Sequence, residues 1–287
     1  MTPKQQKGFF DKNGYLLVEK LFPENMLSEI RKVVLEFQER SKLISCSNTV
    51  FDVGNGHSAD HPVLRRIKNP QMQHEIFRRF SEYDPLLDIV ENLLGNHGVR
   101  FDHGKLNFKP KSGDAAVEWH QDWAFYPHTN DDMLAVGIML EDCTADNGPL
   151  MVMPGSHTGP IYNHHHGGYF IGAMDVTEIS DQLDNAVAIT APAGSISIHH
   201  VRTLHASREN ITDQNRPLLL FSYLAIDSYP IVDHYDWDEF NSRILRGDIC
   251  YTPRQEKVPI RISFPRVPEN DSIFDDQKSV RGRSFGG

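Results

Sequence analysis

The chain has 287 residues, of which 39% are hydrophobic and 24% are charged. This balance is typical of a globular protein with a sizeable core, and it excludes an intrinsically disordered chain. The formal net charge is -10 and no block of basic residues occurs, so we expect no nucleic-acid partner.

Cysteine usage and hydropathy indicate the compartment. Cys46, Cys143 and Cys250 are few, odd in number and widely spaced, as in a reduced cytoplasmic protein rather than a disulfide framework. The first residues lack the long apolar stretch of a secretory signal, and no apolar run approaches the length of a membrane span. We therefore expect a cytoplasmic location and no membrane partner, while the oligomeric state is open.

The first part of the chain, 1–98, is predicted to be a mostly helical support. Helical spacing of apolar residues and Pro or Gly boundaries predict these elements in order: a helix from Thr2-Pro3 to about 12, a strand at GYLLVEKLF, a helix at 23–42, a loop at 46–62, and helices at 71–81 and 84–94.

From residue 99 the pattern changes to short strands separated by Gly, Pro and Asn-Gly turns. This pattern favours an all-β sandwich or barrel. Together with the preceding helices it predicts a jelly roll, a mainly β fold with flanking helices (α+β). We expect one domain over 1–287, with the jelly-roll core at 99–226 and a C-terminal lid or tail at 227–287.

The stretch EWHQDWAF contains two polar residues with the spacing of a metal site. His120 and Asp122 are two positions apart, and residues at that spacing in a strand point to the same face. An ordinary buried His–Asp hydrogen bond would use the same pair. The pair alone leaves both interpretations open.

Downstream, three histidines and one arginine offer the missing partners. His199, His200 and His205 are candidate third ligands, and Arg216 opens the apolar strand RPLLLFSY. An arginine on a largely apolar face is costly unless it meets an anion, and its planar fork suits a carboxylate. Two histidines and one carboxylate form the facial triad of non-haem Fe(II) oxygenases, and a dicarboxylic co-substrate would need such an arginine.

These residues lie in sequence segments that resemble the phytanoyl-CoA dioxygenase family of Fe(II)/2-oxoglutarate oxygenases. The matching stretches are WHQD at 119–122, NGPLMVMPGSHTG at 147–159 and HHVRTLHASRENITDQNR at 199–216. The resemblance runs from about Gly8 to Tyr223. It implies a double-stranded β-helix of the cupin-like type, and Fe(II), 2-oxoglutarate and O2 as cofactor and co-substrates.

The resemblance also implies roles for particular residues. His120, Asp122 and His205 would be the catalytic iron ligands, and Ser207 and Arg216 would hold the far carboxylate of 2-oxoglutarate. Family members often place an Asn or Gln at the position of Asn107 to bind the near carboxylate. The family often reads H-G-S where this chain has Ala206 in the middle, a mild departure. The carboxylate at 122, which halogenating relatives lack, implies a hydroxylase.

The strand FDHGKLNFKP predicts a polar face directed into the barrel. Lys105 and Asn107 share one face, opposite Leu106 and Phe108, and a lysine directed inward needs an anionic partner. Lys109 lies on the same strand face as Lys105, but its position near the end of the strand favours exposure to solvent.

Further candidates for substrate binding come from three other positions. Tyr126 shares parity with His120 and Asp122, and His200 is predicted to face inward because Ile196 and Ile198 share its face. Lys105, Tyr126, His200 and Arg202 would together hold a small, anionic substrate.

The tract WHQDWAFYPHTNDD, with KLNFKP before it and HHVRTLH after it, resembles the branch of the family that acts on organophosphonates or hypophosphite. This resemblance implies an organophosphonate such as a 2-aminoethylphosphonate as the substrate. Hypophosphite, an amino acid, an ectoine-like solute or a natural product are alternatives with the same chemistry. A catalytically silent jelly-roll binding protein is the alternative of another class.

Overall fold

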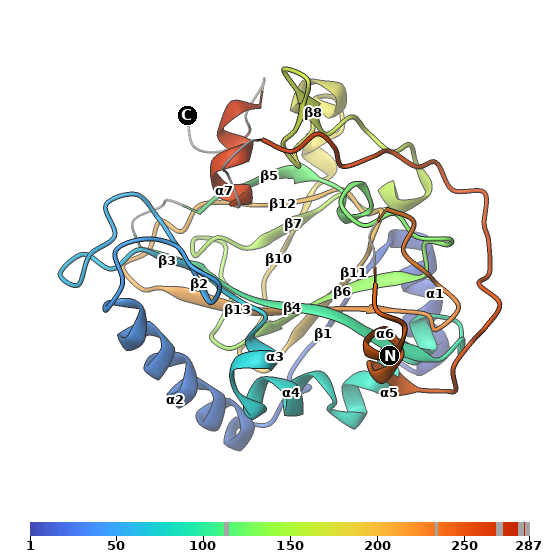
Figure 1. Cartoon of the computed structure of the whole chain (residues 1–287), viewed down its shortest axis with the longest axis horizontal. Helices are drawn as coiled ribbons and strands as arrows, with labels where there is room; N and C mark the ends of the chain where they lie inside the picture. Colours follow the sequence, from blue (N-terminus) through green and yellow to red (C-terminus); the bar gives the residue numbers. More distant parts are fainter. Residues whose placement is uncertain (112–114, 233–234, 268–271, 281–283, 285–287) are drawn as a thin grey trace.

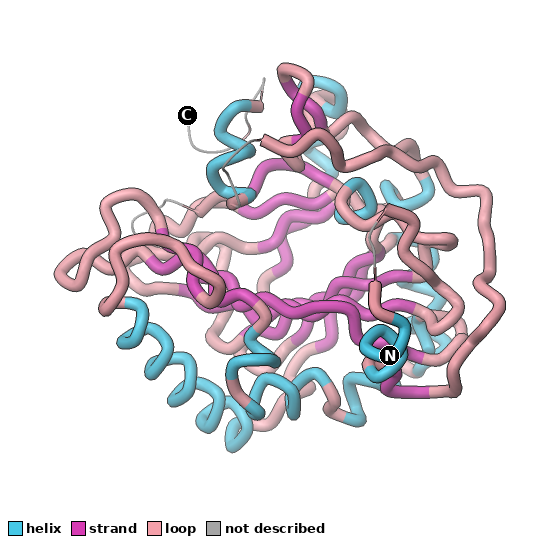
Figure 2. The backbone as a smooth tube through the Cα atoms, in the orientation of Figure 1, coloured by secondary structure: helices cyan, strands magenta, loops and turns pink. Residues whose placement is uncertain are grey.

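Two facing β-sheets form the centre of the computed structural model, which describes residues 1–111, 115–232, 235–267, 272–280 and 284. Figure 1 shows the sheets opposite one another, and Figure 2 shows helices on the outside of the strands. This is the predicted mainly β jelly roll with flanking helices.

The larger sheet combines strands from the whole chain. Its order is β1 (Tyr15–Val18), β11 (Ile196–His200), β6 (Met133–Met139), β13 (Arg216–Leu224), β4 (Val99–Lys109), β3 (Leu64–Lys68) and β2 (Phe51–Val53), and β14 (Ile244–Arg246) also pairs with β4. The N-terminal part therefore supplies both edges of this sheet as well as helices. The predicted loop at 46–62 was wrong in this respect, because it contains β2.

The smaller sheet faces the inner side of the larger one. Its order is β10 (Val187–Ile189), β7 (Leu150–Val152), β12 (His205–Ser207) and β5 (Val117–His120). A separate hairpin joins β8 (His165–His166) to β9 (Tyr169–Phe170). The pairing of β12 with β5 brings segments more than eighty residues apart into register.

The N-terminal helices cover the outer face of the larger sheet, whereas the C-terminal helix α7 (Ile273–Asp276) lies beside β5 of the smaller sheet (Figure 1). The N-terminal helices are α1 (Pro3–Asn13), α2 (Glu24–Ser41), α3 (Pro70–Gln73), α4 (Glu75–Ser81) and α5 (Asp84–Leu93), and the C-terminal ones are α6 (Trp237–Ser242) and α7. The helix predicted at 71–81 is divided, because His74 adopts an extended backbone and its ring accepts a hydrogen bond from the Ile76 amide.

The main hydrophobic core lies between the larger sheet and the N-terminal helices, outside the barrel. Ile30 and Phe37 of α2 pack there against strand residues such as Leu106, Ile138 and Ile198, all nearly inaccessible to solvent. The outer face of each strand is therefore apolar, and the alternating inner face is free to carry polar groups. No helix in the described ranges is long and apolar enough to cross a membrane.

Candidate metal centre and active site

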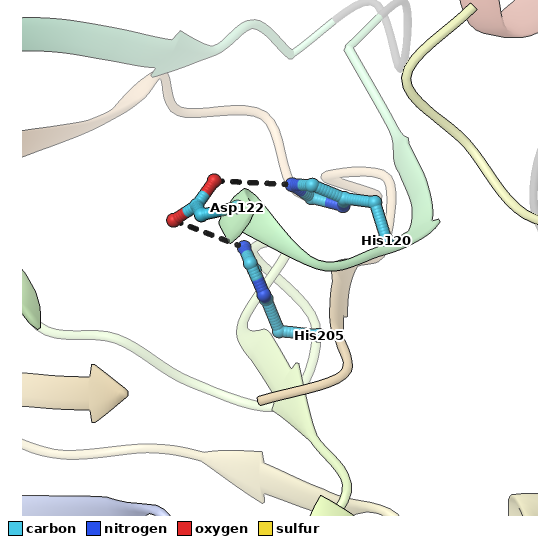
Figure 3. Close-up of side chains that lie close together, drawn as sticks. All are labelled: His120, Asp122 and His205. Carbon is cyan, nitrogen blue, oxygen red and sulfur yellow. Dashed lines mark ion pairs between the residues drawn. The ribbon is translucent and has the colours of Figure 1, made fainter. Parts of the chain in front are cut away.

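Two neighbouring strands of the smaller sheet bring three candidate ligands together. β5 ends at His120 and β12 begins at His205, and these residues are direct partners in the antiparallel register. Asp122 reaches the same point from a 3₁₀ turn rather than from the strand. The His120 Nε2–Asp122 Oδ1 and His205 Nε2–Asp122 Oδ2 distances are both 3.8 Å, and one donor atom of each residue lies within 4.8 Å of the others (Figure 3).

Backbone contacts fix the tautomer of both imidazoles. Nδ1 of His120 lies 2.8 Å from the Glu118 carbonyl oxygen, and Nδ1 of His205 lies 2.9 Å from the Thr203 carbonyl oxygen. A carbonyl oxygen only accepts, so each Nδ1 carries the proton and donates it. Each Nε2 therefore presents a lone pair toward Asp122, as a metal-binding imidazole must.

Burial and charge hold the three groups in the protonation states that a metal needs. Burial lowers the pKa of His120 to about 4 and the pKa of His205 well below its usual value. Burial alone would raise the pKa of Asp122, but His205, His199 and Lys105 outweigh it and hold that pKa well below the usual range. Two neutral imidazoles and an ionised carboxylate match the donor set of a non-haem Fe(II) site with open positions.

A third histidine, His199, contacts this group. It was one of the candidate third ligands in the sequence, but its neighbour His200 was the one predicted to face inward. The Nε2 atom of His199 lies 3.3 Å from Asp122 Oδ2, and the His199 ring centroid is 4.2 Å from that of His205. Its Nδ1 is buried and has no hydrogen-bond partner in the described part of the chain. A carboxylate oxygen only accepts, so Nε2 of His199 carries a proton and donates it to Asp122.

The prediction that His200 faces inward is wrong. His200 shares a face with Ile198, as predicted, but that face is directed toward the helix-covered core outside the barrel. Its ring lies 6.3 Å from that of Phe10 in α1 and 5.4 Å from that of His157. The alternation of the strand therefore turns His199, not His200, into the site.

A narrow cavity of about 80 Å³ extends from the triad to Arg216. Asn107 and Ser207 line it, together with apolar residues such as Leu218. The Arg216 guanidinium is 3% exposed and donates to the carbonyls of Asn147 and Gly148. It forms no ion pair among the described residues, so its charge is available to an anion in the cavity. A dicarboxylate that reaches from the triad to Arg216 fits this arrangement.

A wider cavity of about 340 Å³ opens on the other side of the triad. Its cationic lining residues are Arg66, Lys68, Lys105 and Arg266, its acidic ones are Asp122 and Asp276, and its aromatic ones are His103, His120, Phe125, Tyr126 and Phe170. The two cavities share the triad residues His120 and Asp122, and also Arg66, Lys105 and Ile273. Arg266, Ile273 and Asp276 of the C-terminal segment thus contribute to the wall of the site.

Arg66 stands where the two cavities meet, and the sequence alone did not single it out. Its Nε donates to Asn107 Oδ1 at 2.9 Å, a contact across the β3–β4 pair. A signal was present in the sequence, because Arg66 and Lys68 alternate with the apolar Ile67, and this stretch forms β3.

Two other predictions on basic residues need correction. Arg202 lines neither cavity, since its guanidinium is paired with Asp131 at 2.9 Å and donates to the Gly159 carbonyl. Lys109, predicted to be exposed, is only 5% exposed and lines the narrow cavity. The strand end is covered because the chain returns to it through Ala115 and β12.

Relatives with similar sequences include proteins named as dioxygenases. The sequence profile of the phytanoyl-CoA dioxygenase (PhyH) family matches residues 10–218. The chain is 32% identical to a probable alpha-ketoglutarate-dependent hypophosphite dioxygenase of Stutzerimonas stutzeri, over 99% of this chain and 100% of that protein. It is 27% identical to the ectoine dioxygenase of Stutzerimonas stutzeri strain A1501, over 76% of each chain.

Solved structures agree on the fold. The ectoine dioxygenase EctD from S. alaskensis with bound Fe superposes with a TM-score of 0.66 at 22% identity, over 91% of this chain and 88% of that one. The epimerase SnoN, in complex with Fe3+ and alpha ketoglutarate, superposes with a TM-score of 0.65 at 17% identity, over 88% and 97%. The chain belongs to the phytanoyl-CoA dioxygenase family and is a non-haem iron, 2-oxoglutarate-dependent dioxygenase.

Proposed function

We propose that this enzyme oxidises a small phosphorus oxyanion in the cytoplasm. His120, Asp122 and His205 hold Fe(II), while Asn107 and Arg216, together with the Ser207 hydroxyl, hold 2-oxoglutarate. Iron with 2-oxoglutarate and O2 supplies oxidation of a C–H or P–H bond, with release of succinate and CO2. The cysteines are all unpaired, which supports the cytoplasmic location.

Two observations bear on which phosphorus compound is oxidised. The relative that spans the whole chain is described as a probable hypophosphite dioxygenase, which favours hypophosphite. The cavity of about 340 Å³ is larger than so small an ion requires, which favours an organophosphonate such as 2-aminoethylphosphonate. Both compounds share a charged phosphorus oxyanion, and we propose that this shared group is what the site recognises.

The observation that carries this proposal is a pair of like charges across two strands. In the β3–β4 register Lys68 lies directly opposite Lys105, and both line the wider cavity. Like charges directly opposite one another destabilise a sheet. Neither ammonium forms an ion pair with any other residue that the structure describes. A bound anion would offset this repulsion.

The surroundings of Lys105 strengthen the need for an anion. Burial lowers the pKa of its ammonium, the nearby Asp122 carboxylate opposes this effect, and Arg66 adds to it. An oxyanion bridging Lys105 and Lys68 would sit beside the triad, so that the bond to be oxidised faces the metal. Tyr126 lines the same cavity, which supports a role as hydrogen-bond donor to the anion. His200 and Arg202 have no part in this proposal, because both lie outside the cavity.

Succinate release tests the proposal. Fe(II)-loaded protein with 2-oxoglutarate is assayed with hypophosphite, 2-aminoethylphosphonate and methylphosphonate, and with L-proline and ectoine as comparison substrates of other classes. We expect one or more of the phosphorus compounds to stimulate succinate release above the rate without substrate. Stimulation by proline or ectoine alone would refute the phosphorus oxyanion and leave the enzyme class intact.

Variants test the anion site itself. In Lys105→Met the substrate-free turnover of 2-oxoglutarate should persist, while stimulation by the phosphorus compound falls about tenfold or more, because one charge-assisted contact is lost. Lys111→Met, on the exposed chain after the same strand, is the matched control and should respond as wild type. An undiminished response in Lys105→Met would contradict the site.

A further inference from the structure

A second pair of like charges lies at the other end of the same strand. In the β13–β4 register Arg216 is the direct partner of Lys109, four residues along β4 from Lys105. Arg216 is 3% exposed and Lys109 is 5% exposed, and both line the narrow cavity. Two buried cations in direct register are costly unless an anion compensates them.

Contacts of the Lys109 ammonium tie it to the part of this cavity that Ser207 also lines. It donates to the carbonyl of Ala115 and, at 3.4 Å, to the carbonyl of Ser207 in β12. The ammonium thus crosses from the larger sheet to the smaller one. This part of the cavity is built from three strands, β4, β12 and β13, which contribute Lys109, Ser207 and Arg216.

Gly148 holds both cations in place. Its carbonyl accepts a hydrogen bond from Arg216, and a side chain at its Cα would come within 3.2 Å of the Lys109 stem and 2.8 Å of the Arg208 carbonyl. Its φ of +78° also favours glycine. The chain therefore packs closely around the Lys109 stem and directs the ammonium toward the Arg216 side of the cavity.

Only neutral carbonyls contact the two cations in the described residues. Among the described residues Arg216 has no carboxylate partner, and the Glu209 carboxylate attracts the Lys109 ammonium without forming an ion pair with it. Burial, reinforced by Arg216, lowers the pKa of the Lys109 ammonium well below its usual value. A site that concentrates positive charge in this way favours a ligand with a full negative charge in that part of the cavity.

We propose that Lys109 and Arg216 together bind the far carboxylate of 2-oxoglutarate, so that the co-substrate is recognised by two cations. This inference rests on the proposed co-substrate site. The alternative role for Lys109 is a structural tie that only joins the Ala115 and Ser207 carbonyls. The two roles differ in what they predict for ligands with and without the far carboxylate.

The test compares 2-oxoglutarate with 2-oxopentanoate, which has the same chain length and lacks the far carboxylate. Calorimetry on the anaerobic Fe(II)-loaded protein gives the dissociation constant of each ligand, and their ratio measures the preference for the far carboxylate. Lys109→Gln keeps hydrogen-bond donors for the two carbonyls and removes the charge, and Lys109→Met removes both. Lys111→Met is the surface control, and Arg216→Met is the reference for a lost cation.

We expect both Lys109 variants to lose about ten- to a hundredfold of the preference for 2-oxoglutarate, which is the range for one hydrogen bond between charged groups. Binding of 2-oxopentanoate and of Fe(II) should stay as in wild type. A wild-type preference in Lys109→Gln, or an equal loss for both ligands, would overturn the inference. If Arg216→Met also keeps the preference, the co-substrate site itself is misplaced, which separates the two failures.

Discussion

Replacing His199 with leucine is expected to weaken metal binding about tenfold without abolishing it. His199 donates from Nε2 to Asp122 Oδ2, and leucine removes that donor while filling much of the same volume. The carboxylate would then be held by fewer contacts and would orient toward the metal less precisely.

The magnitude follows from the geometry. A hydrogen bond to a charged group contributes roughly 1.5–3 kcal/mol, and the best ones are shorter than 3 Å. The observed 3.3 Å contact belongs at the lower end of that range, and about 1.4 kcal/mol corresponds to a factor of ten. Removing a side chain that hydrogen-bonds to a metal ligand typically lowers metal affinity by about ten- to a hundredfold.

Calorimetric titration of metal-free protein with Fe(II), under anaerobic conditions, measures the effect. His200→Leu is the matched control, since His200 is the next residue of β11 and faces the opposite side. Its metal affinity should equal that of wild type. Unchanged affinity in His199→Leu would refute the assigned contact. If His199→Leu lost tight Fe(II) binding completely, the assigned role would also be refuted, because His199 would then be a metal ligand itself.

Two further predictions concern the ligands and their protonation. His120→Ala and His205→Ala should each lose tight Fe(II) binding in the same titration and keep the circular-dichroism spectrum of the fold, because both side chains lie at strand ends; full affinity in both would contradict the triad. Burial lowers the pKa of His120 to about 4 and that of His164 to about 3, so both stay neutral in the folded protein at pH 5.5. The unfolded chain takes up protons below pH ~6.5, so stability is complete above that pH and is lost as the pH falls. At pH 5.5 the loss is about 1.4 kcal/mol for each histidine, about 3 kcal/mol for these two. Burial also lowers the pKa of His200 to about 3, so His200 adds about 1.4 kcal/mol to the sum. Urea unfolding of metal-free protein at pH 7.5 and 5.5 checks this sum, and equal stability at both values would show that these histidines ionise freely.

The architecture and the triad candidates could be predicted because their signals are local. Short strands between turn residues indicate a jelly roll, and an H-x-D pair with a distant histidine and arginine indicates the chemistry. Alternation along β4 also predicted correctly that Leu106 and Phe108 pack under the helices, with Lys105 and Asn107 on the cavity side. In each case the spacing of neighbouring residues carries the information.

The same alternation could not decide which face of β11 lies inside the barrel. Ile196 and Ile198 are apolar, and the sequence favoured an apolar interior between the sheets. The structure puts that core between the larger sheet and the helices instead, so the polar neighbour His199 enters the site and His200 leaves it. Periodicity shows that two faces differ, but it does not show which layer of the fold covers each face.

By itself, then, the sequence determined the fold class and the two alternating faces of each strand, because these depend on residues close together in the chain. It also determined the candidate ligands, through motifs at 119–122 and 199–216 that resemble those of a known family. Only the tertiary structure decided the pairing of Lys109 with Arg216 and of Lys105 with Lys68. These contacts arise from strand register between segments from about forty to more than one hundred residues apart. Burial of the Lys109 strand end depends in the same way on how β12 returns across it.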